Sequence, residues 1–156
     1  MKPPSEYYIA NFAARLAETA RMWRNELDAR LVPLGLSQAR GLILHYLAAH
    51  GDGLQQNALA DIVGIRGSTL VRQLDRLESD GWVERRNDPV DRRAKTIHLA
   101  EKAAPLVTAL EAKIQELRLE LLSGLTDQQF EACFFVMDHI QGRIGNNNNG
   151  GDRDAG

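Results

Sequence analysis

The stretch from residue 54 to residue 99 constrains the fold most, because two short helices, a turn and a charged hairpin follow one another there with no room for another element. Apolar residues at helical spacing predict a first helix over 54–63, and Gly64 suits the left-handed conformation that ends a helix. A second helix is predicted to begin near Ser68 and to run to about Asp80. Two helices joined by so short a turn predict a helix-turn-helix.

A hairpin follows the second helix. Residues 82–86 and 95–99 have the composition of two strands, and residues 87–91 between them contain the Asn, Asp and Pro of a turn. Arginines gather at the tip of this hairpin. The pattern as a whole predicts a winged helix-turn-helix, an α+β fold that is mainly α with a small β-hairpin.

The second helix has two chemically different faces, because at 100° per residue its leucines fall opposite its arginines. Most surface arginines are only solvated charges, but arginines opposite a core stripe on this helix favour contact with base edges in the major groove of DNA. Arginines at a hairpin tip are ordinarily part of a soluble turn, yet a slender loop that carries them fits the minor groove. The candidate DNA-binding residues are Arg66, Ser68, Thr69, Arg72, Gln73, Arg76, Arg92, Arg93 and Lys95.

The charge distribution supports a local site for nucleic acid and excludes a protein coated with positive charge. The formal net charge is −2 at pH 7. Residues 66–95 hold eight basic and six acidic residues, a balance of +2, and the rest of the chain holds eleven basic and fifteen acidic residues, a balance of −4. We expect the acids Asp75 and Glu78 to lie away from the arginine face, so that the local field is more positive than the sum.

Long amphipathic helices flank the motif, at about 7–32 and 101–144. Ser37 is a plausible N-cap for a further helix before the motif, and Thr126 with Gln129 has the spacing of a capping box. One winged helix cannot bury both faces of helices this long. We therefore expect a homodimer in which the end helices of two copies pack together, with an intramolecular helical bundle as the alternative.

The chain of 156 residues is predicted to form a single domain over 1–156, with the winged helix-turn-helix at about 54–99. The tail 145–156 contains four consecutive asparagines and is predicted to be disordered. Neither a signal-peptide core nor a membrane-spanning stretch is recognisable, so we expect a cytoplasmic protein with no membrane partner. The single cysteine, Cys133, is predicted to be a small buried apolar residue.

An enzyme is the rival interpretation, and the sequence offers little for it. The four histidines have no metal-ligand spacing with one another or with the cysteine, and a glycine-rich phosphate loop is missing. We therefore expect neither an enzyme, a metal site nor a cofactor. A purely structural helical adaptor would leave the arginine hairpin unexplained.

The sequence resembles the MarR family of bacterial transcriptional regulators, and most closely its SlyA-like branch. The resemblance extends weakly over about 17–125 and is highly specific within the motif. The residues that carry it are Leu59-Ala60, Gly64-Ile65, the run from Leu70 to Glu78, Gly81-Trp82-Val83-Glu84-Arg85, Asp91-Arg92-Arg93-Ala94-Lys95 and the run from Leu99 to Ala103.

The resemblance implies a dimer that binds double-stranded DNA at an inverted repeat, with a wing in which Asp91 orients Arg93. Ala100 departs from the family pattern, which has a threonine cap at this position, so the next helix is expected to begin without a side-chain cap. Trp82 is expected to pack in the core or at the dimer interface. Family members mostly repress transcription, and the alternative is a SlyA-type regulator that activates by competing with other DNA-binding proteins.

The resemblance also implies an effector, either a small aromatic carboxylate, a phenolic compound or an aromatic acyl-CoA. Guanidinium groups beside an aromatic ring suit such an anion. Trp23 could equally be plain packing. The candidate ligand-pocket residues are Arg21, Trp23, Arg24, Ala39 and His45.

Overall fold

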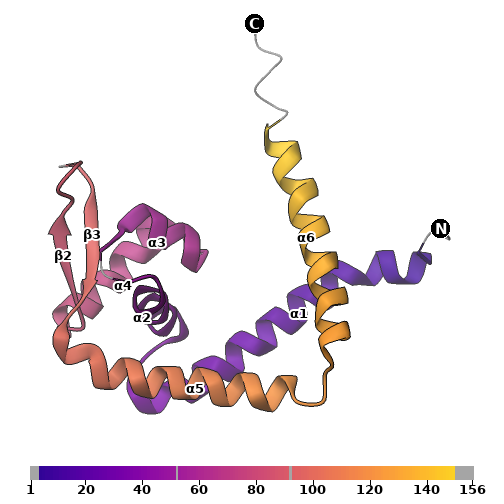
Figure 1. Cartoon of the computed structure of the whole chain (residues 1–156), viewed down its shortest axis with the longest axis horizontal. Helices are drawn as coiled ribbons and strands as arrows, with labels where there is room; N and C mark the ends of the chain where they lie inside the picture. Colours follow the sequence, from indigo (N-terminus) through magenta and orange to yellow (C-terminus); the bar gives the residue numbers. More distant parts are fainter. Residues whose placement is uncertain (1–3, 52, 92, 150–156) are drawn as a thin grey trace, which may run out of the picture. The chain divides into compact units, whose positions relative to one another are not determined.

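The computed structural model of the chain describes residues 4–51, 53–91 and 93–149, with Arg92 outside the described residues. It has the predicted mainly helical winged helix-turn-helix fold, and Figure 1 shows its hairpin projecting from the helices of the motif. In chain order the elements are α1 (Glu6–Leu31), η1 (Val32–Leu34), α2 (Gln38–His50), β1 (Leu54–Gln55), α3 (Gln56–Val63), α4 (Gly67–Ser79), β2 (Val83–Asn87), β3 (Lys95–Leu99), η2 (Glu101–Ala103), α5 (Ala104–Leu122) and α6 (Asp127–Asn149).

The described residues divide after Leu117 into two compact units. The first holds the helix-turn-helix, the sheet, α1 and most of α5, and the second holds the end of α5 and all of α6. The predicted single domain stays a prediction. The helices of the described residues include none that is long and apolar enough to cross a membrane.

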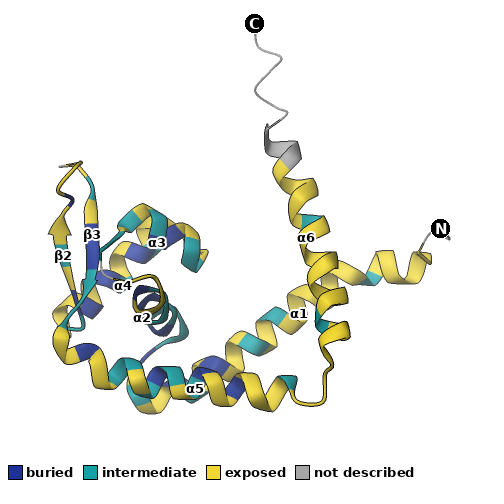
Figure 2. Ribbon diagram, in the orientation of Figure 1, coloured by how far each residue is buried: buried dark blue, intermediate teal, exposed yellow. Residues whose placement is uncertain are grey.

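The hydrophobic core lies in the first unit, where side chains from α1, α2, α3, α4, β3 and α5 meet. Figure 2 shows buried residues on α2, α4, β3 and the middle of α5. The leucine stripe of α4 is fully buried, as predicted from its spacing. Its members are Leu70, Leu74 and Leu77.

Helix α2 approaches α1 and α5 closely at Gly41, where a side chain would not fit. A Cβ atom at Gly41 would lie 2.5 Å from Cδ1 of Leu31 and 3.4 Å from Cδ1 of Leu110. Both leucines are completely buried, so neither can move without disturbing its own neighbours. A glycine in the first turn of α2 therefore sets how near the three helices come.

The sheet has three strands in the order β1-β3-β2, one more than the predicted hairpin. Leu54 and Gln55 were expected to begin a helix, and this prediction is wrong: they pair antiparallel with β3, Leu54 opposite Ile97. The pairing satisfies extended backbone that would otherwise lack partners next to a buried strand, which favours a strand over a first helical turn. Helix α3 begins only at Gln56.

Local signals place most helix ends as predicted. Gly64 ends α3 with φ of 72° and donates its backbone N–H to Ala60 O at 2.9 Å. Ser37 Oγ accepts the backbone N–H of Arg40 at 3.4 Å and caps α2. Before η2, Ala100 makes no side-chain cap, which is the expected departure from the family pattern.

Helix α6 begins with the predicted capping box. The backbone N–H of Thr126 donates to Gln129 Oε1 at 2.9 Å, and the backbone N–H of Gln129 donates to Thr126 Oγ1 at 3.4 Å. The helix continues to Asn149, and the disordered tail expected over 145–156 stays a prediction. Residues 150–156 lie outside the described residues. Cys133 on α6 is exposed, which corrects the prediction that it is buried.

A buried carboxylate ties the hairpin turn to the first strand. Asp88 accepts Gln55 Nε2 at 2.8 Å and the backbone N–H groups of Val90 and Asp91 at 2.8 and 3.1 Å. These hydrogen bonds favour the charged form and hold the pKa of the Asp88 carboxyl below its ordinary value. The backbone N–H of Asp91 makes the largest contribution. The turn is thus joined to the edge of the helix-turn-helix.

We expect Gly41→Ala to destabilise the protein by about 1–3 kcal/mol, because an added methyl group must displace a buried leucine. Chemical denaturation followed by circular dichroism measures this change. Gly67→Ala is the matched control, since a Cβ at Gly67 meets nothing within 4 Å. It should be neutral or stabilising by up to about 1 kcal/mol. Equal effects of the two substitutions would contradict the close-packing explanation.

We expect Asp88→Asn to lower stability at neutral pH, with a loss that disappears in acid. Since folding lowers the pKa of Asp88, its contribution is present above the unfolded-state value of 3.8 and is lost as the pH falls through the folded-state pKa. Urea midpoints of the wild type and the variant should therefore converge as the pH falls below that range. A difference that stays constant with pH would show that the charge of Asp88 is irrelevant.

Candidate nucleic-acid interface

Helix α4 presents three sectors around its axis, one more than its sequence predicts. The first is the buried leucine stripe. About 100° further round lie Val71, Asp75 and Glu78, spaced by four and three residues. The remaining sector holds Ser68, Thr69, Arg72 and Arg76, which are exposed apart from the half-buried Thr69.

The arginines of the third sector have no bonding partner among the described residues. The side chains of Arg72 and Arg76 make no hydrogen bond or ion pair with any other residue that the structure describes, and the same holds for Arg66, the N-cap residue of α4. All three are exposed. Their guanidinium groups therefore keep every donor for an outside acceptor, such as a phosphate or a base edge.

The acidic residues of α4 are paired with an arginine from the sheet. Asp75 Oδ1 lies 2.6 Å and Glu78 Oε2 lies 3.0 Å from Nη1 of Arg85 on β2. These acids lie away from the third sector, as predicted. Arg85, counted in the basic patch from sequence, is a partner of these acids and not a free cation.

The hairpin tip carries one described arginine that faces solvent. Arg93 is exposed, and its backbone N–H donates to Asp91 Oδ1 at 2.9 Å. Asp91 thus shapes the turn at the backbone of Arg93, and its role in orienting Arg93 toward DNA stays a prediction. Lys95 is exposed and its Nζ donates across the hairpin to Asn87 Oδ1 at 2.5 Å.

Sequence reasoning missed two residues that hold this surface together, Arg85 and Asp88. Strand alternation offered a signal for the first, because Arg85 shares the inward side of β2 with the buried Val83. The run Asn-Asp-Pro offered one for the second, because aspartate in a turn commonly accepts backbone N–H groups a few residues further on. Gln73, a candidate contact on α4, is half-buried at the border of the leucine stripe.

The candidate ligand-pocket residues lie on α1 and α2. Trp23 is half-buried and packs against the hydrophobic core, and Arg21 and Arg24 beside it are exposed. Ala39 is half-buried, and Nδ1 of His45 lies 2.6 Å from Glu111 Oε1 on α5. His45 thus contacts α5. The role of these five residues in binding a ligand stays a prediction.

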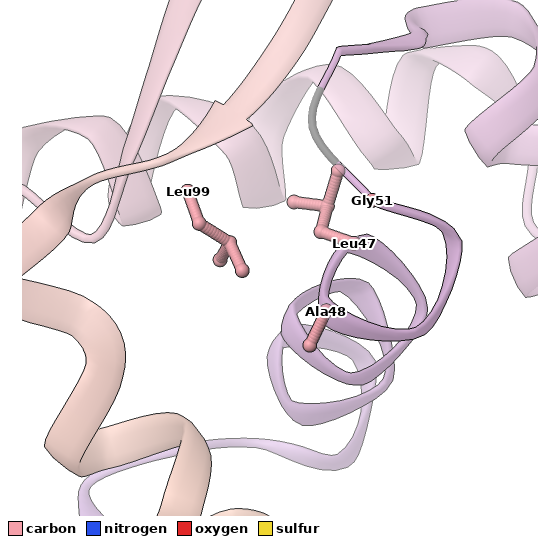
Figure 3. A pocket seen from close by; sticks show the side chains of 4 residues that line it. All are labelled: Leu47, Ala48, Gly51 and Leu99. Atoms are coloured by element: carbon pink, nitrogen blue, oxygen red, sulfur yellow. The ribbon is translucent and has the colours of Figure 1, made fainter.

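Two of the hollows among the described residues lie in the first unit, and neither is lined by the residues of that set. One, of about 230 Å³, is bounded by Leu47, Ala48, Gly51 and Leu99, between the end of α2 and the end of β3 (Figure 3). The other, of about 350 Å³, lies on the surface and is lined by Arg40, Asp75, Arg76, Ser79 and Asp80.

The remaining predictions concern packing and metals. Trp82 packs against the core as expected, and Nζ of Lys102 lies 4.9 Å from its ring centroid. Among the residues that the structure describes, no group of three or more His, Cys, Asp or Glu side chains could hold a metal ion.

Comparisons with known proteins agree with this geometry. A model of the MarR family matches residues 34–94. The structure of transcriptional regulator PA3341 is 45% identical, with a TM-score of 0.80 over 86% of this chain and 98% of that one. MepR from S. aureus, in its DNA-binding conformation, is 25% identical, with a TM-score of 0.76 over 85% of this chain and 98% of MepR.

A ligand-bound structure is also similar. CouR from Rhodococcus jostii RHA1, bound to p-coumaroyl-CoA, is 26% identical, with a TM-score of 0.75 over 87% of this chain and 95% of CouR. The family match falls on the helix-turn-helix and the hairpin, and the similar structures extend the likeness over most of the chain. The chain belongs to the MarR family of transcriptional regulators.

Proposed function

We propose that the protein is a homodimeric repressor of transcription that inserts α4 into the major groove, and the hairpin of β2 and β3 into the minor groove, of an inverted-repeat operator. The observation that carries the proposal is a set of exposed guanidinium groups without a partner among the described residues: Arg72 and Arg76 on one sector of α4, and Arg66 at its N-cap. The acids of the same helix are held on another sector by Arg85, so they do not oppose a DNA phosphate there.

The unpartnered apolar surface of the outer helices supports the homodimer. Large apolar side chains are exposed along the first half of α1 and along α6, where Figure 2 shows almost no buried residue. A second copy of the chain would cover such a surface and would supply the second α4 that an inverted repeat requires. The exposed residues are Tyr7, Tyr8, Ile9, Phe12 and Leu16 on α1, and Phe134, Phe135, Val136, Met137 and Ile144 on α6.

A small aromatic anion or an aromatic acyl-CoA is the effector that we propose. Arg21 and Arg24 are exposed on α1 near the half-buried Trp23 in sequence, and guanidinium groups with an aromatic ring suit a ligand that has an aromatic ring and an anionic group. The similarity to CouR, whose structure contains p-coumaroyl-CoA, supports the same class of ligand. Bound between α1 and the helix-turn-helix, such a ligand would change the separation of the two α4 helices and release the DNA.

Arg72→Ala should weaken binding to a duplex selected by the wild-type protein from a randomised pool by about 1–3 kcal/mol. It should also relax the preference at one base position, because the lost guanidinium recognises a base edge there. Arg72→Lys separates charge from geometry, since lysine keeps the charge and loses the planar fork. Fluorescence anisotropy with the selected duplex and its single-base variants measures both effects.

Lys113→Ala is the control, because it removes one positive charge from α5, where Lys113 pairs with Glu116 at 2.8 Å. It should leave affinity and base preference as in the wild type. If Arg72→Ala weakens all duplexes equally, Arg72 contacts only phosphate and the base-recognition role is wrong.

The effector and the operator should oppose each other reciprocally. A ligand that weakens DNA binding tenfold must bind about tenfold more weakly to the DNA complex, a coupling of about 1.4 kcal/mol. Calorimetric titration of aromatic acids and their coenzyme A thioesters, with and without the selected duplex, measures this coupling. A tight ligand with equal affinity in both titrations would remove the sensor role and leave the DNA-binding role intact.

A further inference from the structure

Arg85 crosses from the hairpin to one side of α4 and binds it at three points. Besides the two carboxylates, its Nη2 donates to the backbone carbonyl of Val71 at 3.1 Å. Its own backbone N–H donates to Glu78 Oε1 at 3.1 Å, so Glu78 binds both the backbone and the guanidinium group of Arg85. The side chain is only 19% exposed, which places these contacts at the edge of the protein interior.

The three partners lie one above another along α4, at Val71, Asp75 and Glu78. A planar guanidinium that contacts successive turns restricts rotation of the helix about its axis and also its distance from β2. Rotation matters here, because a shift by one residue position turns the helix by 100° and would point Arg72 away from the direction it now faces.

A contribution to folding stability does not by itself explain the cluster of Arg85 with Asp75 and Glu78. The Nε atom of Arg85 is buried and has no hydrogen-bond partner among the described residues, and two carboxylates share one guanidinium at the edge of the core. An apolar side chain on the inward side of β2 would pack without these desolvation costs, and such replacements are often neutral or stabilising. What an apolar residue could not do is fix the angle of α4.

The same residue connects α4 to the hairpin. Arg85 lies opposite Ile97 in the pairing of β2 with β3, and β2 leads directly into the turn that carries Arg93. One side chain therefore links the two parts that are proposed to enter the two grooves. Arg86, the next residue, is exposed and pairs with Glu84 of its own strand at 3.0 Å, and it makes no hydrogen bond or ion pair with α4 among the described residues.

We propose that Arg85 is a positioning residue that sets the rotational angle of α4 against the hairpin and so determines how sharply the protein discriminates its operator, without touching DNA. The proposal rests on the proposed function, recognition of an operator by α4.

Arg85→Lys tests the proposal, with Arg86→Lys as the matched control on the same strand. The probes are the duplex selected by the wild-type protein and a scrambled duplex of equal length, each measured over a range of salt concentration. Arg85→Lys should reduce the ratio of the two affinities by about tenfold, the size of one lost base contact. Its affinity for the scrambled duplex and its salt slope should not change, because Arg85 neutralises no phosphate. Arg86→Lys should leave the ratio within about twofold of the wild type.

Asp75→Asn provides a second variant on the other side of the contact. A purely electrostatic effect of losing this acid would raise affinity for both duplexes and preserve their ratio, whereas a turned helix lowers the ratio. In the Arg85→Lys background, Arg72→Lys should also cost less discrimination than it does in the wild type, because α4 no longer aims Arg72 at its base.

The outcomes separate this proposal from the proposed function. If the wild type binds both duplexes equally, operator recognition fails and the positioning role fails with it. If the wild type discriminates but Arg85→Lys and Asp75→Asn keep the wild-type ratio, only the positioning role is wrong. A salt slope lowered by about one in Arg85→Gln, which removes the positive charge, would assign Arg85 to a phosphate contact and overturn the proposal.

Discussion

Burial of the leucine stripe of α4 is the interaction on which the interface depends. Leu70, Leu74 and Leu77 are completely buried among residues of the other helices and the sheet, so the opposite side of α4 must face solvent. The position of each arginine on α4 follows from this burial, because the helix has a fixed number of residues per turn. Hydrophobic packing thus decides which polar groups are presented, although it contributes nothing to their chemistry.

Ion pairing then decides which cations remain available. Arg40 and Arg85 are drawn to acidic residues at the end and the side of α4, at Asp80, Asp75 and Glu78. Arg72 and Arg76, on the outward sector of α4, have no such partner among the described residues. A protein with a net charge of −2 can in this way keep a strongly cationic strip, since its acids are neutralised locally or placed elsewhere.

Sequence patterns predicted the features that depend on local backbone chemistry or on helical period. Gly64, Ser37 and the capping box at Thr126 act within a few residues of themselves, so their roles could be predicted without a fold. The pairing of Leu54 with Ile97 and the grip of Arg85 on α4 join positions far apart along the chain or on different elements. No local pattern encodes such contacts, and strand alternation only hinted at the second. Exposure of Cys133 was missed because an apolar helix such as α6 suggests a covered face, which a single copy does not supply.

The order of the three strands also affects how copies of the protein can associate. Strand β1 is only two residues long and covers one edge of β3, so β2 provides the longer free edge of the sheet. That edge carries Glu84 and Arg86, both exposed and paired with each other. Charged side chains on an edge strand oppose the addition of a strand from another molecule. Unwanted sheet extension between copies is thereby discouraged, and the apolar helices are left as the surface through which copies can meet in a defined way.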